Sequence, residues 1–144
     1  MKKERVKDLR PYETALCAGR EANINELIEQ FMKDPALHHI CVVDNKDRLL
    51  GLVNRKRLFK VLFLHHLSPD TRLSKLLGLV TAETSSDLML THVISCREDE
   101  GIRELIKKII VNRIRELPVV DDEGRVLGFV TIPMLLKKWM EGEV

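Results

Sequence analysis

Aromatic residues are scarce in this chain of 144 residues, which contains one Trp, one Tyr and four Phe. Platforms that stack single-stranded bases are built from aromatic side chains, so this scarcity disfavours that kind of nucleic-acid binding. The charge is also nearly balanced, with 24 Lys and Arg against 22 Asp and Glu. Because no bulk positive field attracts a polyanion, a nucleic-acid partner is disfavoured and any basic patch must be local.

Cysteines are equally few, and Cys17, Cys41 and Cys96 form no CxxC pair and no Cys/His ligand spacing. A zinc site and a disulfide framework are therefore both disfavoured, and three reduced thiols suit a cytoplasmic protein. No apolar run approaches the roughly 18 residues of a membrane span. The charged opening MKKERVKDLR also lacks the apolar core of a signal peptide. We therefore expect a soluble, cytoplasmic chain.

What the sequence does contain is an internal repeat. HHICVVDNKDRLLGLVN, residues 38–54, returns 77 residues later as RELPVVDDEGRVLGFVT, residues 115–131, without a gap and with seven identical positions. A chain of this length forms one ordinary domain or two very small ones. The repeat favours two small halves that share a core, residues 1–80 with an N-terminal lead and residues 81–144.

Each half has the same order of signals, namely a short strand, an amphipathic helix, two strands joined by a polar turn, and a second helix. In the first half these are a strand at 15–18, a helix at 24–32, strands at 39–44 and 48–53, and a helix at 55–66. In the second half they are a strand at 92–96, a helix at 98–113, strands at 117–121 and 125–130, and a helix at 132–140. A short helix is expected around 73–79. Pro118 lacks an amide hydrogen and is expected at the start of its strand.

The pattern hhVVDxxxxhhGhhT, where h is apolar, occurs twice and resembles the CBS domain pair, also called a Bateman module, over residues 6–141. The resemblance implies an α+β fold of two β-α-β-β-α CBS repeats packed as a pseudo-twofold pair with two clefts between them. In many members these clefts hold AMP, ADP, ATP or S-adenosylmethionine. Such modules usually regulate an attached or partner protein and often form homodimers.

The family's nucleotide pattern is G-h-h-S/T-x-x-D, in which the hydroxyl and the helix N-terminus receive phosphate and the Asp binds the ribose hydroxyls. The second repeat keeps Thr131 but has Met134 where the Asp belongs, and the first repeat has Asn54 and Arg57 at these two positions. Both clefts lack the ribose clamp, which favours a ligand without a ribose diol or one held by phosphate alone. The ligand-binding residues implied by the resemblance are Thr131, Met134, Ile94, Arg115, Pro118, His39, Asn54 and Arg57.

A purely structural role is an alternative to ligand binding for these residues, because Thr131 and Asn54 are also suited to capping a helix. Cations at 55–57 oppose the dipole of the helix that they begin, which hints at an anionic ligand or partner, although a solvated face explains them too. No catalytic triad, paired carboxylates or metal box stands out, and Asp121-Asp122-Glu123 suits a turn. We therefore expect no enzyme, no metal and no required cofactor.

Three functional hypotheses follow. The first is a regulatory module that senses a small adenosine-containing or other anionic metabolite and passes its state to a protein partner. The second is a dimerisation or protein-interaction module with degenerate clefts, and its contact residues would be Leu58, Val61, Leu62, Leu135, Leu136 and Trp139. The third and weakest is nucleic-acid binding through Arg55, Lys56, Arg57 and Lys60.

Overall fold

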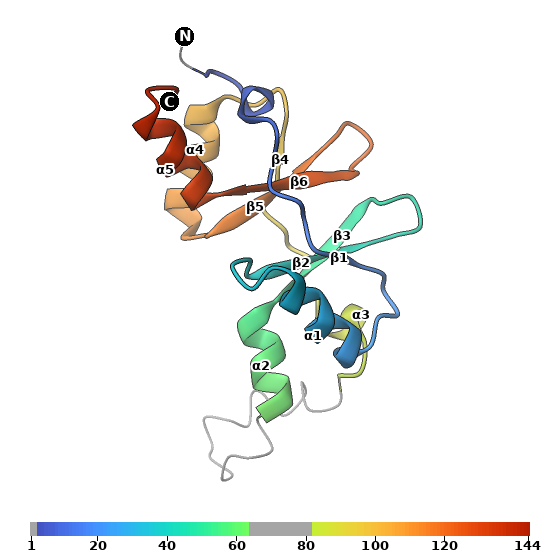
Figure 1. Ribbon diagram of the computed structural model, residues 1–144. Helices are drawn as coiled ribbons and strands as arrows, with labels where there is room; N and C mark the ends of the chain where they lie inside the picture. Colours follow the sequence, from blue (N-terminus) through green and yellow to red (C-terminus); the bar gives the residue numbers. More distant parts are fainter. Residues whose placement is uncertain (1–2, 64–81) are drawn as a thin grey trace. The chain divides into compact units, whose positions relative to one another are not determined.

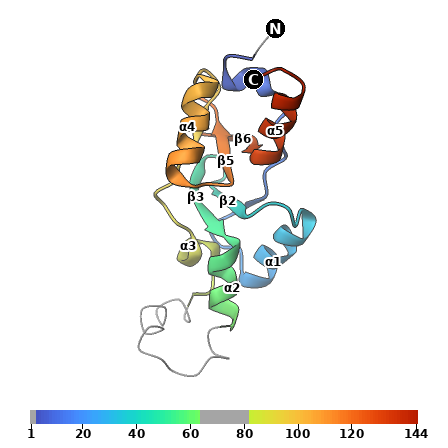
Figure 2. The same cartoon turned by 90° about the vertical axis from the view of Figure 1, so that its left-hand side faces the viewer.

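The computed structural model describes residues 3–63 and 82–144 (Figures 1 and 2). Its elements, in chain order, are η1 (Val6–Leu9), β1 (Cys17–Ala18), α1 (Ile24–Lys33), β2 (His39–Val43), β3 (Leu49–Asn54), α2 (Arg55–Phe63), α3 (Ser85–Leu88), β4 (Cys96–Arg97), α4 (Ile102–Asn112), β5 (Glu116–Val120), β6 (Val126–Thr131) and α5 (Ile132–Met140). The order strand, helix, strand, strand, helix occurs twice, which confirms the predicted α+β fold. The helix expected around 73–79 lies outside the described residues.

Contacts divide the described residues into two compact units. Unit 1 takes in the chain up to Ala15, together with Asn45–Leu49 and His92–Val144, and holds the β4-β5-β6 sheet. Unit 2 takes in Leu16–Asp44 and Leu50–Thr91, and holds the β1-β2-β3 sheet except for Leu49. The predicted boundary at 80–81 adjoins the residues that are not described and stays a prediction.

The core of unit 1 forms where α4 covers its sheet. Ile102, Leu105 and Ile109 are buried at helical spacing, as the sequence predicts. They pack in one cluster with Val6 and Leu9 of η1 and with strand residues Cys96, Leu117, Val119 and Val130. The lead of the chain is therefore part of the core of the unit that carries the second repeat.

The core of unit 2 is built in the same way around α1. Asn23 caps this helix, since its side chain accepts the N–H of Glu26 at 2.9 Å. Leu27 and Phe31 are buried on the helix, and Ile40 and Val42 are buried on β2. The helix ends at Lys33, directly before Asp34-Pro35, where the sequence predicts a break.

Pro118 corrects one prediction, because it lies in the middle of β5 and not at its start. It is opposite Phe129 of β6, whose backbone N–H and C=O bond instead to Glu13, at 2.8 and 3.0 Å. At the equivalent position of the first repeat, Cys41 donates its N–H to Leu16 O at 2.7 Å. Pro118 has no hydrogen for such a bond.

The strand predicted at 92–96 is wrong in extent for a related reason. Its observed counterpart, β4, contains only Cys96 and Arg97, and Cys96 pairs with Val119. In the first repeat, pairing already begins at Cys17 opposite Cys41, the residue equivalent to Pro118. The proline thus removes the first rung of the ladder, and β4 joins the sheet one residue later.

In each unit, one glycine leaves room for a neighbouring segment that runs across the sheet. In unit 1 the extended chain at Tyr12 and Glu13 runs along β6, and a Cβ on Gly128 would lie 2.7 Å from both Glu13 O and Tyr12 Cβ. In unit 2 Leu52 of β3 exchanges backbone hydrogen bonds with Leu90 at 2.8 and 3.0 Å, and a Cβ on Gly51 would lie 2.7 Å from Leu90 O. The repeated glycine is therefore required for packing.

Candidate functional site

Thr131 occupies the junction of β6 and α5, where the sequence places a helix cap. Its Oγ1 accepts the N–H of Met134 at 3.3 Å, and Pro133 lies in the first turn of the helix. The predicted cap is confirmed. Only 8% of Thr131 is exposed, so this hydroxyl is a built part of unit 1.

Arg115 lies beside the same junction. Its carbonyl accepts the N–H of Ile132 at 3.3 Å, and the next residue, Glu116, pairs with Thr131 across the β5-β6 ladder. Arg115 is exposed, whereas Pro118, further along β5, is buried. The structure thus brings a guanidinium-bearing residue and a hydroxyl to the start of α5.

Ile94 and Met134 supply apolar surface to unit 1. Both are half-buried and pack against its core cluster, Ile94 from the segment before β4 and Met134 from the first turn of α5. A thioether is a weak acceptor and cannot bind a diol as a carboxylate does. We call Ile94, Arg115, Pro118, Thr131 and Met134 the second-repeat site. It offers a cation, a hydroxyl and apolar surface, but no carboxylate at position 134.

The first-repeat site, His39, Asn54 and Arg57, lies in unit 2. Asn54 Oδ1 accepts the N–H of Lys56 at 2.8 Å and that of Arg57 at 3.3 Å, which confirms the predicted cap. Asn54 Nδ2 lies 3.1 Å from His39 Nε2. The structure therefore brings these three predicted residues together through hydrogen bonds.

The cations at the start of α2 are held by hydrogen bonds to backbone carbonyls and to a histidine ring. Arg57 Nε donates to Leu88 O at 3.0 Å, and its side chain is half-buried. Arg55 donates to Pro35 O at 2.5 Å and to His38 Nδ1 at 2.9 Å. Within residues 3–63 and 82–144, no carboxylate forms an ion pair with either arginine. The positive charge at this end of α2 is thus held in place but not neutralised.

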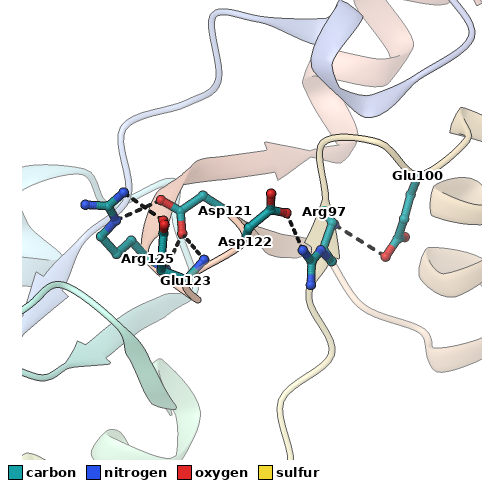
Figure 3. Close-up of polar contacts among 6 residues, drawn as sticks. All are labelled: Arg97, Glu100, Asp121, Asp122, Glu123 and Arg125. Carbon is teal, nitrogen blue, oxygen red and sulfur yellow. Dashed lines mark hydrogen bonds and ion pairs between the residues drawn. The ribbon is translucent and has the colours of Figure 1, made fainter.

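Asp121 organises the turn between β5 and β6 (Figure 3). Its Oδ1 accepts the N–H groups of Glu123 and Arg125, both at 2.9 Å, and its Oδ2 accepts Arg125 Nε at 2.8 Å. Asp122 forms an ion pair with Arg97, whose backbone N–H also reaches Glu100 at 3.4 Å. These carboxylates are engaged in turn structure, as the sequence predicts.

An open hollow of about 690 Å³ lies at the tips of the two hairpins, within unit 1. It is lined by Lys46, Asp47, Arg48, Glu123 and Arg125, all exposed. None of the predicted site residues lines it. Arg125 is already paired with Asp121 and Glu123, so this hollow does not replace the two sites above.

A charged cluster that sequence reasoning missed ties the lead of the chain to the segment before α4. Glu98 accepts hydrogen bonds from Arg10 at 2.5 and 2.6 Å and from the Tyr12 hydroxyl at 2.7 Å. These bonds, from Arg10 first and then Tyr12, hold the pKa of Glu98 below its usual value. No local pattern predicts a contact between residues so distant in sequence.

The structure argues against two roles considered from the sequence, self-association through Leu58 and Val61 and thiol chemistry at Cys96. Leu58 and Val61 are 4% and 7% exposed, so they belong to the core of unit 2 and cannot serve self-association as proposed from the sequence. Burial, and secondarily Glu100, raises the pKa of the Cys96 thiol to about 12, which disfavours thiolate chemistry.

The described residues contain no cluster of three or more potential metal ligands from His, Cys, Asp and Glu. None of their helices is long and apolar enough to cross a membrane.

Comparison with known families identifies the class of this protein. The family model of the CBS domain matches residues 6–64 and 86–141, and the chain belongs to this family. Uncharacterized protein MK0525 of Methanopyrus kandleri is 26% identical over 106 residues, which are 74% of this chain and 48% of that protein. The chain thus spans about half of that relative, and only 18% and 23% of the next two.

Solved structures give the same fold. The CBS domain pair of protein MJ0100, in complex with 5′-methylthioadenosine and S-adenosyl-L-methionine, has a TM-score of 0.72 and 24% identity over 96% of this chain and 97% of its own. CBSX2 in complex with AMP has a TM-score of 0.75 and 19% identity, and covers 99% of this chain and 100% of its own. At these identities the likeness establishes the fold.

Proposed function

We propose that this protein is a cytoplasmic regulatory module that binds a small anionic, adenosine-containing metabolite, of the class of AMP, ADP, ATP or S-adenosylmethionine. Its membership of the CBS family supports this, as do the adenosine compounds bound to the similar pairs. The observation that carries the proposal is the second-repeat site, where the Arg115 carbonyl accepts the N–H of Ile132, the residue after Thr131, in a unit that also presents Ile94 and Met134. We expect no catalytic turnover and no required cofactor.

The side chains of this site favour particular parts of such a ligand. The guanidinium of Arg115 suits a phosphate or carboxylate, because it donates several hydrogen bonds and stays charged. Apolar Ile94 and Met134 suit the face of a purine. Since Met134 gives no carboxylate for a ribose diol, the anionic group has to supply more of the affinity. We therefore expect AMP to bind more tightly than adenosine.

Regulation follows if the ligand stabilises one arrangement of the chain more than another. A ligand shifts such an equilibrium only by the difference in its affinity for the two arrangements. A protein partner that reads the arrangement then responds to the metabolite. We propose such a partner in addition to the ligand.

A thermal-shift and calorimetric panel tests the ligand. AMP, ADP, ATP, S-adenosylmethionine and adenosine are added to the purified chain, each with and without magnesium. A ligand at a hundredfold excess over its Kd adds about 2.7 kcal/mol of stability, a shift of several degrees for a domain of this size. A panel without any shift on a folded protein would favour the interaction module instead.

Two matched pairs of variants locate the site. Arg115→Gln is expected to weaken binding of the active ligand at least about tenfold, because a charged hydrogen bond contributes roughly 1.5–3 kcal/mol. Arg103→Gln removes an exposed arginine on α4 and serves as its control. Thr131→Ala removes the hydroxyl, whereas Thr131→Ser keeps it. Equal affinities within both pairs would place the ligand elsewhere.

We also propose that the protein is a homodimer. Large apolar side chains are exposed at equivalent positions of both repeats, and the exposed fraction reaches 61% for Phe59 and 60% for Leu136. The other equivalent pairs are Met32 with Ile110 and Phe63 with Met140. Exposed apolar residues that recur in both repeats indicate a surface that another protein chain contacts. Light scattering at micromolar concentration tests this, and a monomeric mass would refute it.

A further inference from the structure

Two cysteines lie side by side in the sheet of unit 2. Cys17 of β1 and Cys41 of β2 are direct partners in the parallel ladder, and the N–H of Cys41 donates to Leu16 O at 2.7 Å. Residues that are directly opposite each other on neighbouring strands carry their side chains on the same face of the sheet. The register therefore places two sulfur atoms next to each other, although the two residues are far apart in sequence.

The spacing of the strands suits a covalent bond between these residues. Neighbouring strands lie about 4.7–4.9 Å apart. Disulfides join residues whose Cα atoms are roughly 4.4–6.8 Å apart. Both cysteines are thiols in this structure. A disulfide between them therefore requires no change in the pairing of β1 with β2.

The two thiols differ in their access to solvent. Cys17 is half-buried, whereas Cys41 is fully buried. A small oxidant therefore reaches Cys17 first. Cysteines that sense oxidants often combine an accessible thiol with a neighbouring thiol that resolves the oxidised form. The difference in burial assigns the first role to Cys17 and the second to Cys41.

The second repeat has one cysteine and no such pair. Pro118 occupies the position equivalent to Cys41, and Cys96 pairs with Val119 in unit 1. The pair is thus a feature of the first repeat alone, and Cys96 serves as an internal control in the same chain.

We propose that Cys17 and Cys41 form a reversible disulfide when the protein meets a hydroperoxide. The Cys17 thiolate attacks the O–O bond of hydrogen peroxide, becomes a sulfenic acid and releases hydroxide, which takes up the proton that the thiol has lost. The Cys41 thiol then attacks this sulfur, so that the S–S bond forms, the S–O bond breaks and water leaves. Two thiols and one peroxide give one disulfide and two waters, and the two electrons lost by sulfur reduce the peroxide.

This inference rests on the strand register and depends neither on the proposed ligand nor on the proposed homodimer. A single reversible link also differs from the disulfide framework that the sequence disfavours. Disulfides of cytoplasmic proteins are usually transient and catalytic or redox-sensing.

The link would lie beside the proposed first-repeat site. His39 and Cys41 are two residues apart on β2, so their side chains share a face of the sheet. His39 Nε2 in turn lies 3.1 Å from Asn54 Nδ2. Oxidation would therefore tie the strand that carries His39 to β1, which places this site under redox control.

Mass spectrometry tests the link on the full chain, which is first reduced and then treated with hydrogen peroxide. The protein is expected to lose the mass of two hydrogen atoms without gaining oxygen. Trypsin is then expected to release residues 8–20 joined to residues 34–46, and dithiothreitol to separate them. Conversion of the thiols to sulfinic and sulfonic acids without a link would overturn the proposal, and so would a link to Cys96 or between two chains.

Variants of each cysteine complete the test. Cys17→Ser and Cys41→Ala are each expected to abolish the link, whereas Cys96→Ala is expected to keep it. Because Cys17 is half-buried, its variant keeps the test valid even where the buried Cys41 variant fails to fold. A link in either folded variant that lacks one of the pair would refute the assignment.

Urea unfolding supplies a second measurement. The oxidised wild type is expected to unfold at a higher urea concentration than the reduced protein, because the link constrains the unfolded chain between residues 17 and 41. Cys17→Ser is expected to show no such rise after the same treatment. An unchanged midpoint in oxidised wild type would mean that the folded sheet strains the link, and it would overturn the argument from the register.

Discussion

Replacing Gly128 with alanine is expected to loosen the lead of the chain from β6. The new Cβ would lie 2.7 Å from Glu13 O and 2.7 Å from Tyr12 Cβ, whereas ordinary contacts begin at 3.4 Å. One of the two neighbours is backbone and cannot turn away. Either the strand shifts, or the segment at Tyr12 and Glu13 moves off its bonds with Phe129.

Both routes give a similar cost. Overpacking a close contact costs roughly 1–3 kcal/mol. Loss of the two backbone hydrogen bonds between Glu13 and Phe129 costs about 1–3 kcal/mol, at roughly 0.5–1.5 kcal/mol for each bond. We therefore expect about 2 kcal/mol of destabilisation, within both of these ranges. For a chain of this size that corresponds to a melting temperature lower by roughly 4–8 °C.

Thermal and urea unfolding of three variants test this reasoning. Gly51→Ala meets Leu90 O at 2.7 Å and is expected to behave like Gly128→Ala, while Gly19→Ala meets nothing within 4 Å and serves as the control. Hydrogen exchange at the amides of Glu13 and Phe129 is expected to accelerate in Gly128→Ala alone. Equal stability of the Gly128 and Gly19 variants would refute the steric argument.

Three further predictions concern single side chains. Glu98→Gln is expected to be less stable than wild type at pH 7. Because the pKa of Glu98 is lowered in the folded protein, its carboxylate stabilises the fold above the unfolded pKa of 4.5. This stabilisation disappears as the pH falls below that value. Urea unfolding at pH 7 and at a pH well below 4.5 measures the difference in stability between wild type and variant. A difference that is the same at the two pH values would contradict the ion-pair explanation. Asn54→Ala is expected to cost about 1 kcal/mol through loss of the α2 cap, and Asn54→Asp to cost less, by thermal unfolding. Leu105→Ala, fully buried, is expected to cost about 2–5 kcal/mol in the same assay, and a cost under about 1 kcal/mol would contradict the described core.

Local features of the sequence predict most of the fold because each has a local cause. The apolar spacing of residues 102–110 sets α4, and the residues Thr131 and Asn54 end their strands and cap the helices that follow. Asp121 is predicted in a turn because Asp side chains accept backbone N–H groups nearby, and it does so. These interactions connect residues within four positions of each other.

The errors in the strands arise from tertiary contacts. The N–H that Pro118 lacks would face β4, as the equivalent N–H of Cys41 faces Leu16 O, so the proline leaves the β5-β6 pairing intact. Phe129, opposite it, bonds to Glu13, a partner more than a hundred residues away in sequence. Close contacts with distant segments, Glu13 at Gly128 and Leu90 at Gly51, explain why the glycine occurs in both repeats. Similarly, Arg57 is held by Leu88 O, 31 residues further on. Long-range partners decide these positions, so the sequence pattern alone cannot.

The repeat separates structural positions from the positions of the proposed ligand sites. Asp121 and Gly128, which are identical in both repeats, organise a turn and admit a crossing segment. The site positions differ instead: Thr131 is replaced by Asn54, and Met134 by Arg57. The first-repeat site is rich in nitrogen donors, whereas the second joins a cation to apolar surface. The two proposed sites therefore differ in chemistry, so one ligand is not expected to occupy both equally.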